Sequence, residues 1–112
     1  MQTFDEIKLY LRKFAEDRDW LKFHSPKNLA MALSVEVAEL LEHFQWLSEE
    51  QSRHLDAAQK QEVAEEIADV QLYLIRLADR LDIDIITAVN DKTKVNEKRF
   101  VVDKVKGSAT KR

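Results

Sequence analysis

Apolar residues recur every three or four positions in four stretches of the chain, which is the pattern of helices with one buried face. The first stretch predicts a helix over about residues 4–18, because Thr3 and Glu6 have the spacing of a capping box just before it. Residues 19–24 break this period and predict a loop rich in aromatic residues. The stripe of the first helix consists of Phe4, Ile7, Leu11 and Phe14.

Cap residues and longer apolar stripes predict a second and a third helix. Ser25 and Pro26 supply a cap and a first helical residue for a helix that continues to about residue 47. Residues 48–54 predict a short polar connection with room for one helical turn. Asp56 caps a third helix that extends to about residue 81. The stripes are Leu33, Val37, Leu40, Phe44 and Leu47 on the second helix, and Val63, Ile67, Val70, Leu74, Leu77 and Leu81 on the third.

A fourth helix begins at Asp82 or Asp84, carries the apolar residues Ile85, Ile86 and Val89, and fades by Phe100. No period remains in residues 101–112, so this segment is predicted to be a mobile or partner-docking tail. One helical domain is therefore expected over residues 1–100, followed by that tail.

Composition supports an all-α fold. The chain has 112 residues, of which 45% are hydrophobic and 35% charged, as expected for helices with one wet face. A single Gly and a single Pro leave little turn chemistry for a sheet. The absence of Cys excludes disulfides and thiolate metal ligands, and it is consistent with a reducing cytoplasm.

Charge and hydropathy argue against nucleic-acid and membrane partners. The net charge of −3 gives no general attraction to nucleic acid. No apolar run approaches the length of a membrane span, and the first residues do not resemble a signal peptide. The charge is nevertheless segregated, because basic residues collect near the end of the chain, at Lys92, Lys94, Lys98, Arg99, Lys104 and Lys106.

Two acidic pairs carry the candidate chemistry: Glu36 with Glu39 on the second predicted helix, and Glu66 with Asp69 on the third. The i, i+3 spacing places both carboxylates of a pair on one helix face. At about 100° per residue, the apolar stripe lies roughly 60° to one side of the first acid and the second acid roughly 60° to the other. If these two helices pack antiparallel through their stripes, both pairs flank one cleft.

Four carboxylates beside a hydrophobic core are destabilising unless a positive charge is held between them. All-oxygen ligation suits Mg²⁺ or Mn²⁺, whereas zinc prefers Cys and His. A plainer interpretation is that the four acids are ordinary solvated residues, since a single Glu-x-x-Glu occurs on many helices. The same placement on two neighbouring helices favours the metal site.

The acidic motif and its flanking residues resemble the MazG-like nucleoside triphosphate pyrophosphohydrolases, an all-α family, and within it the short, single-domain dCTP-pyrophosphatase branch. The resemblance covers about residues 4–100. One departure is Phe100, which stands where the branch usually has Tyr, and no Pro follows it. The matching segments are Arg18-Asp19-Trp20, Phe23-His24-x-Pro26-x-Asn28, Glu36-x-x-Glu39 with Phe44-Gln45-Trp46, Glu66-x-x-Asp69 with Tyr73, and Asn90-x-Lys92-x-x-x-Asn96-x-x-Arg99.

The resemblance implies a Mg²⁺-dependent hydrolase in which water attacks the α-phosphorus of a nucleoside triphosphate and releases pyrophosphate. It implies that Glu36, Glu39, Glu66 and Asp69 are the metal ligands, with Glu36 the first candidate to orient or deprotonate the water. Lys92, Asn96 and Arg99, which share a helix face at i, i+4 and i+7, would contact phosphates. Trp20, His24, Asn28, Trp46 and Tyr73 would line the pocket for base and deoxyribose. It further implies a homo-oligomer, with a tetramer preferred over a dimer.

Plainer roles and rival functions remain open for these residues. Trp20, Trp46 and Tyr73 would also serve as packing residues, and Lys92 and Arg99 as a solvated face near a helix end. A ferritin-like carboxylate bundle is disfavoured, because it needs Glu-x-x-His. The rival functions are a non-catalytic helical oligomerisation module, a dUTPase-type enzyme and a phosphoribosyl-ATP-type enzyme, and the sequence does not determine the preferred base.

Overall fold

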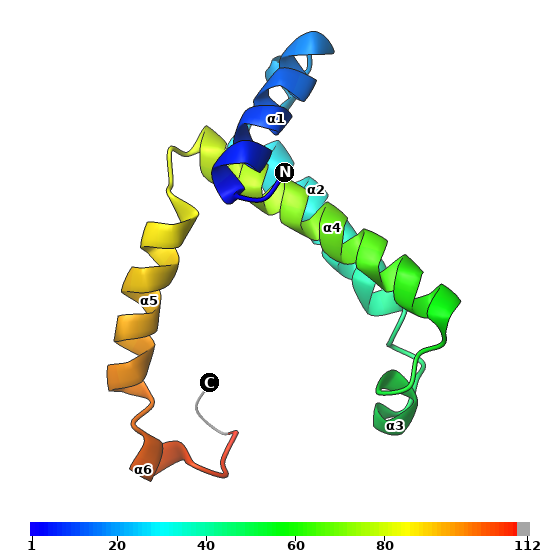
Figure 1. Cartoon of the computed structure of the whole chain (residues 1–112), viewed down its shortest axis with the longest axis vertical. Helices are drawn as coiled ribbons and strands as arrows, with labels where there is room; N and C mark the ends of the chain where they lie inside the picture. The colour runs from blue at the N-terminus through cyan, green and yellow to red at the C-terminus, as the bar shows by residue number, and fades with distance from the viewer. Residues whose placement is uncertain (110–112) are drawn as a thin grey trace. The chain divides into compact units, whose positions relative to one another are not determined.

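The computed structural model describes residues 1–109, and every regular element in that range is helical, which confirms the predicted all-α class. The four long helices agree with the four predicted from periodicity (Figure 1). Residues 1–82 form one compact unit and residues from 83 onward a second, and each is described by itself. The elements are α1 (Phe4–Asp17), the 3₁₀ helix η1 (Leu21–Phe23), α2 (Pro26–Glu42), α3 (Glu49–Ser52), α4 (Ala57–Arg80), α5 (Ile85–Arg99) and α6 (Val102–Val105).

The helices begin where the sequence supplies side-chain caps. The Thr3 hydroxyl accepts from the amide of Glu6 at 3.1 Å, and the Ser25 hydroxyl accepts from the amide of Asn28 at 3.1 Å. At the start of α4, Asp56 and Gln59 satisfy each other's backbone amides at 2.8 and 3.0 Å, which is a full capping box. These bonds satisfy amides that have no intrahelical partner, so the helix starts follow directly from the sequence.

The second helix ends earlier than predicted. α2 stops at Glu42 rather than near residue 47, and residues 43–47 form turns. The amide of His43 bonds the carbonyls of Leu40 and Leu41, which tightens the last turn, and Ser48 then caps the one-turn helix α3. The apolar period through residue 47 therefore marks packing positions rather than continued helix.

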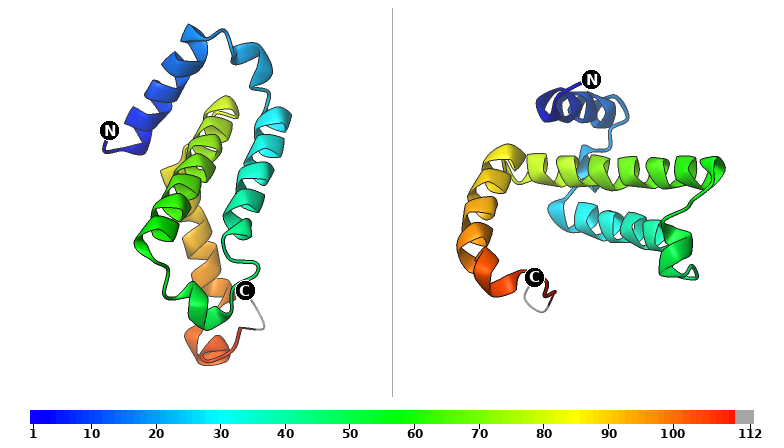
Figure 2. Two further views of the ribbon diagram at one scale, coloured as in Figure 1. Left: turned by 90° about the vertical axis from the view of Figure 1, so that its right-hand side faces the viewer. Right: turned by 60° about the horizontal axis from the view of Figure 1, so that its bottom comes forward.

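α2 and α4 run side by side in opposite directions, as both views of Figure 2 show. His43, at the end of α2, lies 3.8 Å from Glu62 near the start of α4, whereas His24, before α2, bonds Arg76 near the end of α4. The antiparallel arrangement on which the shared acidic cleft depends is thus present. The core side chains of this unit are Ala15, Leu29, Val63, Ile75 and Ala78.

The predicted stripes are only partly buried. Val37, Ile67 and Leu74 are 47%, 55% and 41% exposed, which corrects the expectation that the stripe centres face the core. The reason is that α2 and α4 turn the faces carrying Glu36 and Glu66 toward each other, so one oxygen of each acid is buried in the described unit. The stripes are left at the surface of a single chain.

The helix α1 packs on α4 and is fixed there by an ion pair. The guanidinium of Arg12 donates to both carboxylate oxygens of Asp79, at 2.8 and 2.6 Å. Only 7% of the Asp79 side chain is exposed, and Arg12 holds the pKa of this carboxyl below its usual range. This contact joins positions 67 residues apart and links α1 to α4.

The second unit contains α5 and α6. Asp84 caps α5 by accepting from the amide of Thr87 at 2.9 Å, and the bond from the Phe100 amide to the Asn96 carbonyl, at 2.8 Å, marks its end. The helical turn α6 lies within the segment predicted to be a tail, where no apolar period indicated it. Residues 110–112 of that segment lie outside the described residues, and the division at residue 100 stays a prediction.

Candidate metal centre and adjoining cavity

Three of the four predicted metal ligands meet between α2 and α4. One carboxylate oxygen from each of Glu36, Glu39 and Glu66 lies within 4.8 Å of the other two. Their positions follow from the helix geometry, because Glu36 and Glu39 share one face of α2 and α4 runs alongside. All three side chains are partly buried.

Two oxygens of this cluster are buried without a partner. Oε2 of Glu36 and Oε2 of Glu66 are removed from solvent and accept no hydrogen bond from the part of the chain that the structure describes. A carboxylate oxygen in that state is unfavourable unless a proton or a cation compensates it. Within the described residues, the pair is therefore incomplete as it stands.

The raised pKa of Glu36 has the same cause, namely a buried carboxylate without a compensating positive charge. Loss of solvent, followed by the neighbouring carboxyls of Glu66 and Glu39, raises its pKa to about 7. Loss of solvent raises the pKa of Glu66 as well; its interaction with Glu36 opposes this rise, and the carboxyls of Glu39 and Asp69 add to it. Close carboxyls resist ionising together, so the cluster retains a proton near neutral pH when no cation is present.

Asp69 lies one turn beyond this three-oxygen cluster. It lines the cavity next to the acids, and its charge contributes to the raised pKa values of Glu36 and Glu66. Glu36, Glu39 and Glu66 therefore form one cluster, Asp69 lines the adjoining cavity, and metal binding by the four acids stays a prediction.

The donor set fits a hard divalent cation. Carboxylate oxygens from two rigid helices are the ligands that Mg²⁺ and Mn²⁺ prefer. A cation between Glu36 and Glu66 would satisfy both unpartnered oxygens and replace the retained proton. Glu36, Glu39 and Glu66 are positioned to hold it, and Asp69 stands at the cavity side.

A cavity of about 190 Å³ adjoins the acids and brings together three of the predicted pocket residues. Trp20, His24 and Tyr73 all line it, together with Asp69. The Trp20 ring makes edge contacts with Phe14 at 5.8 Å and with His24 at 6.3 Å between centroids. Aromatic walls next to a cluster of acids suit a ligand that has a flat ring at one end and an anionic group at the other, with a cation between that group and the acids.

Asn28 does not line this cavity but is bonded to the segment next to it. Its side-chain amide donates to the carbonyl of Phe23 at 3.2 Å, which ties the first turn of α2 to η1. The predicted direct contact of Asn28 with a ligand stays a prediction, and the observed bond gives it a supporting part.

Arg76 was not predicted as a site residue. It lines the same cavity, is only 5% exposed, and its Nε donates to Nδ1 of His24 at 3.2 Å. The sequence carried a signal, because Asp69, Tyr73 and Arg76 have i, i+4 and i+7 spacing on one helix face. An arginine that is itself buried is seldom found without a partner.

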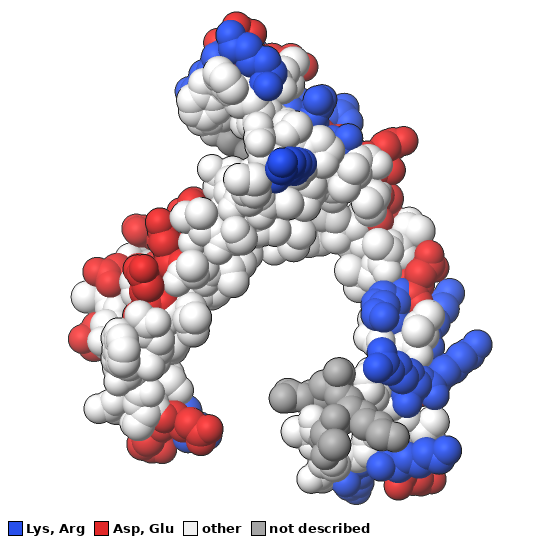
Figure 3. Space-filling view, turned by 180° about the vertical axis from the view of Figure 1, so that it is seen from behind, with Lys and Arg blue, Asp and Glu red and all other residues white. Residues whose placement is uncertain are grey.

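The remaining predicted site residues lie elsewhere. Trp46 is 86% exposed in the turn after α2 and does not line this cavity. Lys92, Asn96 and Arg99 lie on α5 in the second unit, where Figure 3 shows Lys and Arg side chains gathered. Arg99 lies over the ring of Phe100 at 5.1 Å, and Asn96 is half-buried.

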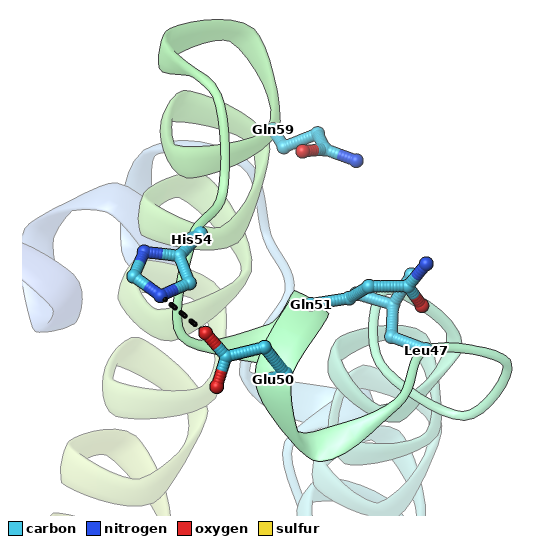
Figure 4. Close-up of a pocket in the computed structure, with 5 residues that line it drawn as sticks. All are labelled: Leu47, Glu50, Gln51, His54 and Gln59. Atoms are coloured by element: carbon cyan, nitrogen blue, oxygen red, sulfur yellow. Dashed lines mark hydrogen bonds and ion pairs between the residues drawn. The ribbon is translucent and has the colours of Figure 1, made fainter.

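A second hollow, of about 350 Å³, lies around α3 (Figure 4). In it, Nε2 of His54 lies 2.9 Å from a carboxylate oxygen of Glu50. None of the predicted site residues lines this hollow.

Among the described residues, no helix is both long enough and apolar enough to cross a membrane.

Comparison with known proteins identifies the family and similar folds. The sequence profile of the MazG-like family matches residues 31–111. The dCTP pyrophosphatase 1 of Rattus norvegicus is 40% identical over 111 residues, and that of Homo sapiens 36%; each match covers 97% of this chain and 65% of the relative. The chain thus spans just under two thirds of these relatives. The crystal structure of a pyrophosphatase from Archaeoglobus fulgidus superposes with a TM-score of 0.82 at 47% identity, covering 87% of this chain and 91% of that one.

Proposed function

Because the chain belongs to the MazG-like family, we propose that it hydrolyses nucleoside triphosphates to the monophosphate and pyrophosphate, with dCTP-type substrates preferred and Mg²⁺ required. The observation that carries this proposal is the pair of buried, unpartnered oxygens on Glu36 and Glu66 beside an aromatic cavity. The relatives named for dCTP and pyrophosphate chemistry support the substrate class.

In the proposed reaction, the oxygen of a water molecule bonds to the α-phosphorus and the bond from that phosphorus to the bridging oxygen of the β-phosphate breaks. Pyrophosphate leaves with the bridging oxygen, and the water proton goes to a carboxylate. A bound Mg²⁺ supplies charge neutralisation of the phosphates. Glu36, Glu39, Glu66 and Asp69 would hold that ion, and Glu36 is the candidate acceptor of the proton.

The cavity would receive the nucleoside. Trp20 and Tyr73 offer ring faces and edges, and His24 offers a ring nitrogen. Two sets of contacts remain predictions from the family resemblance. The first is contact of Lys92, Asn96 and Arg99 with phosphates, and the second is contact of Trp46 and Asn28 with base or sugar. The biological purpose would be removal of unwanted nucleotides from the cellular pool.

Assembly into a homo-oligomer, with a tetramer preferred, is part of the proposal. Large apolar side chains are exposed on both helices of the acidic pair, including Met31 at 57%, Leu41 at 57% and Ile67 at 55%. Burying such a surface against a second copy would be favourable by roughly 25 cal/mol per Å² of apolar area.

The test is a panel of deoxynucleoside triphosphates incubated with Mg²⁺ in ¹⁸O-labelled water, with products separated by chromatography. We expect pyrophosphate and a monophosphate that carries the label, fastest with dCTP. Glu39→Gln should lower kcat/KM on the order of a hundredfold, as expected when several kcal/mol of charge stabilisation is lost. Glu42→Gln, an exposed carboxylate one turn further along α2, is the matched control.

Orthophosphate as the first product, or label in pyrophosphate, would contradict attack at the α-phosphorus. A preference for dUTP or for a phosphoribosyl nucleotide would favour a dUTPase-type or a phosphoribosyl-ATP-type enzyme. No turnover of any triphosphate, together with no effect of Mg²⁺ on stability, would favour a non-catalytic oligomerisation module.

A further inference from the structure

Arg76 is a buried cation that has to share its counter-ion. Its Nη1 donates to Oδ2 of Asp79 at 3.1 Å, but both oxygens of Asp79 already accept from Arg12. One carboxylate therefore serves two guanidinium groups, of which Arg76 is the more buried, at 5% exposed. A charge that deep is costly unless its hydrogen bonds are well placed, so the other partner of Arg76 matters.

That other partner is the ring of His24. The Nε–H of Arg76 donates to Nδ1 of His24 at 3.2 Å. A guanidinium carries only donors, so Nδ1 has to be the acceptor and cannot carry a proton. The neutral ring then bears its hydrogen on Nε2, and this ring nitrogen is the one left for a ligand. The donor inventory thus determines the tautomer of His24.

The surroundings of His24 hold the ring in place and oppose its protonation. Its carbonyl accepts from Nε of Arg80 at 3.0 Å, its amide bonds the Leu21 carbonyl at 3.1 Å, and its ring meets the edge of Trp20. Burial, followed by the charges of Arg76 and Arg80, lowers the pKa of His24. Two successive turns of α4 therefore control one side chain of the cavity wall.

We propose that Arg76 is a positioning residue for the nucleotide cavity: it fixes His24 as a neutral Nε2–H donor for an acceptor oxygen of the nucleoside. This rests on the proposed nucleotide substrate. Arg76 itself touches no reacting atom in this scheme. Its contribution is to remove the choice of tautomer and charge from His24 before the ligand arrives, so that less of the binding free energy is spent on ordering the ring.

A purely structural Arg76 is the rival. In that case it would only strengthen the contact between α1 and α4 through Asp79, and its loss would act on stability alone. Arg12 is the matched control, because it binds the same carboxylate but does not touch His24. Arg76→Met keeps the apolar stem and leaves Asp79 paired with Arg12, so this variant is expected to fold.

The first measurement is ¹⁵N NMR of the histidine rings in the full chain at pH 8, with His24 assigned from the signal lost in His24→Ala. Wild type and Arg12→Met should show only the Nε2–H tautomer, whereas Arg76→Met should show exchange between both tautomers. An Nδ1–H or charged ring in the wild type overturns the inference, and this result does not depend on catalysis.

The second measurement is a double-mutant cycle on hydrolysis of dCTP. Arg76→Met should raise KM about tenfold with little change in kcat, as expected for loss of one well-placed hydrogen bond. In the His24→Ala background, the same substitution should change KM less than twofold, because it acts through the missing ring. An undiminished effect in that background overturns the inference.

The NMR and kinetic measurements together distinguish failure of this inference from failure of the proposed function. If no triphosphate is hydrolysed by the wild type, the proposed function fails. The NMR result then still decides whether Arg76 sets the His24 tautomer, and binding of dCMP to wild type and Arg76→Met replaces KM in the cycle. Equal affinity of dCMP for both proteins overturns the positioning role.

Discussion

Glu36 and Glu66, which lie 30 positions apart on antiparallel helices, bury one carboxylate oxygen each against the other helix, with no hydrogen-bond partner in the described part of the chain. The closeness of the two acids is unfavourable for the protein alone and favourable once a cation joins them. The pair thus lowers stability in the absence of a cation, which is expected if it is prepared for a ligand.

Mg²⁺ should therefore stabilise the protein through this pair. At a concentration of one hundred times its dissociation constant, a ligand that binds only the folded state adds about 2.7 kcal/mol. We expect the melting temperature to rise by several degrees with Mg²⁺ and to fall back after chelation. Calorimetry of wild type and Glu66→Gln measures this, and the variant should lose most of the shift.

Glu65→Gln is the control for that measurement, since Glu65 is the exposed neighbour of Glu66 and the substitution removes the same charge. It should keep the full Mg²⁺ effect. An equal loss in both variants would mean that general surface charge, rather than the buried pair, attracts the ion.

The cation-free protein should lose stability as pH rises. The pKa of Glu36 is raised to about 7 in the folded chain, from an ordinary value of 4.5. A carboxyl with a raised folded pKa favours folding while it is protonated, so that contribution is lost between about pH 4.5 and about pH 7. The lowered pKa of His24 acts in the opposite sense, because its contribution is lost as pH falls below 6.5.

Comparison with Glu36→Gln isolates the carboxyl from His24. With chelator present, the wild type should lose melting temperature relative to this variant between about pH 4.5 and about pH 7. Added Mg²⁺ should abolish the difference in slope. Parallel curves for the two proteins would show that Glu36 titrates normally.

Asp69 should matter more for turnover than for binding of Mg²⁺ in the absence of nucleotide. Three acids already form the compact cluster, whereas Asp69 lines the cavity. Asp69→Asn is expected to lower kcat/KM on the order of a hundredfold and to keep most of the Mg²⁺-induced rise in melting temperature. Full activity would remove Asp69 from the site, and complete loss of the Mg²⁺ effect would make it an equal ligand of the free ion.

Much of the fold was predictable because local signals agreed with one another. Thr3, Ser25, Asp56 and Asp84 each cap a helix where the apolar period begins. The period could not show which side of a stripe faces the partner helix. Ile67 is therefore exposed although it lies in the middle of its stripe, since rotation of the α2 and α4 faces by a few tens of degrees is decided by packing alone.

The site was predictable where its residues are close in sequence. Spacing on single helices indicated both acidic pairs, and the family resemblance added Trp20, His24 and Tyr73, which share one cavity. Spacing places Arg76 on the same helix face as Asp69 and Tyr73, but it could not show what Arg76 binds. Its bond to His24 joins positions 52 apart, and its meaning depends on Asp79 already being held by Arg12.

The ion pair between α1 and α4 should be important for stability. Asp79 pairs both with Arg12, which is half exposed, and with Arg76, whose side chain is only 5% exposed. Removing one member of a buried pair such as Asp79 with Arg76 leaves the other charge without compensation, which costs about 3–5 kcal/mol. Asp79→Ala should thus lower the free energy of unfolding by about 3 kcal/mol in urea titrations at neutral pH. Asp17→Ala, which breaks the exposed pair with Lys13, should change it by less than about 1 kcal/mol. Similar values for the two variants would place Asp79 in a solvated environment.

The exposed stripe of α4 should be an interface between copies of the chain. Ile67 and Leu74 lie on a different face of α4 from the acids, and they are 55% and 41% exposed. Contact with a second copy of the chain would remove this apolar surface from water. Sedimentation should give a species larger than 13.1 kDa, with fourfold mass preferred. Ile67→Lys should shift it toward the single chain. Gln61→Lys adds the same charge about 120° away around the helix and should leave the mass unchanged. A wild type that sediments only at 13.1 kDa would refute the oligomer.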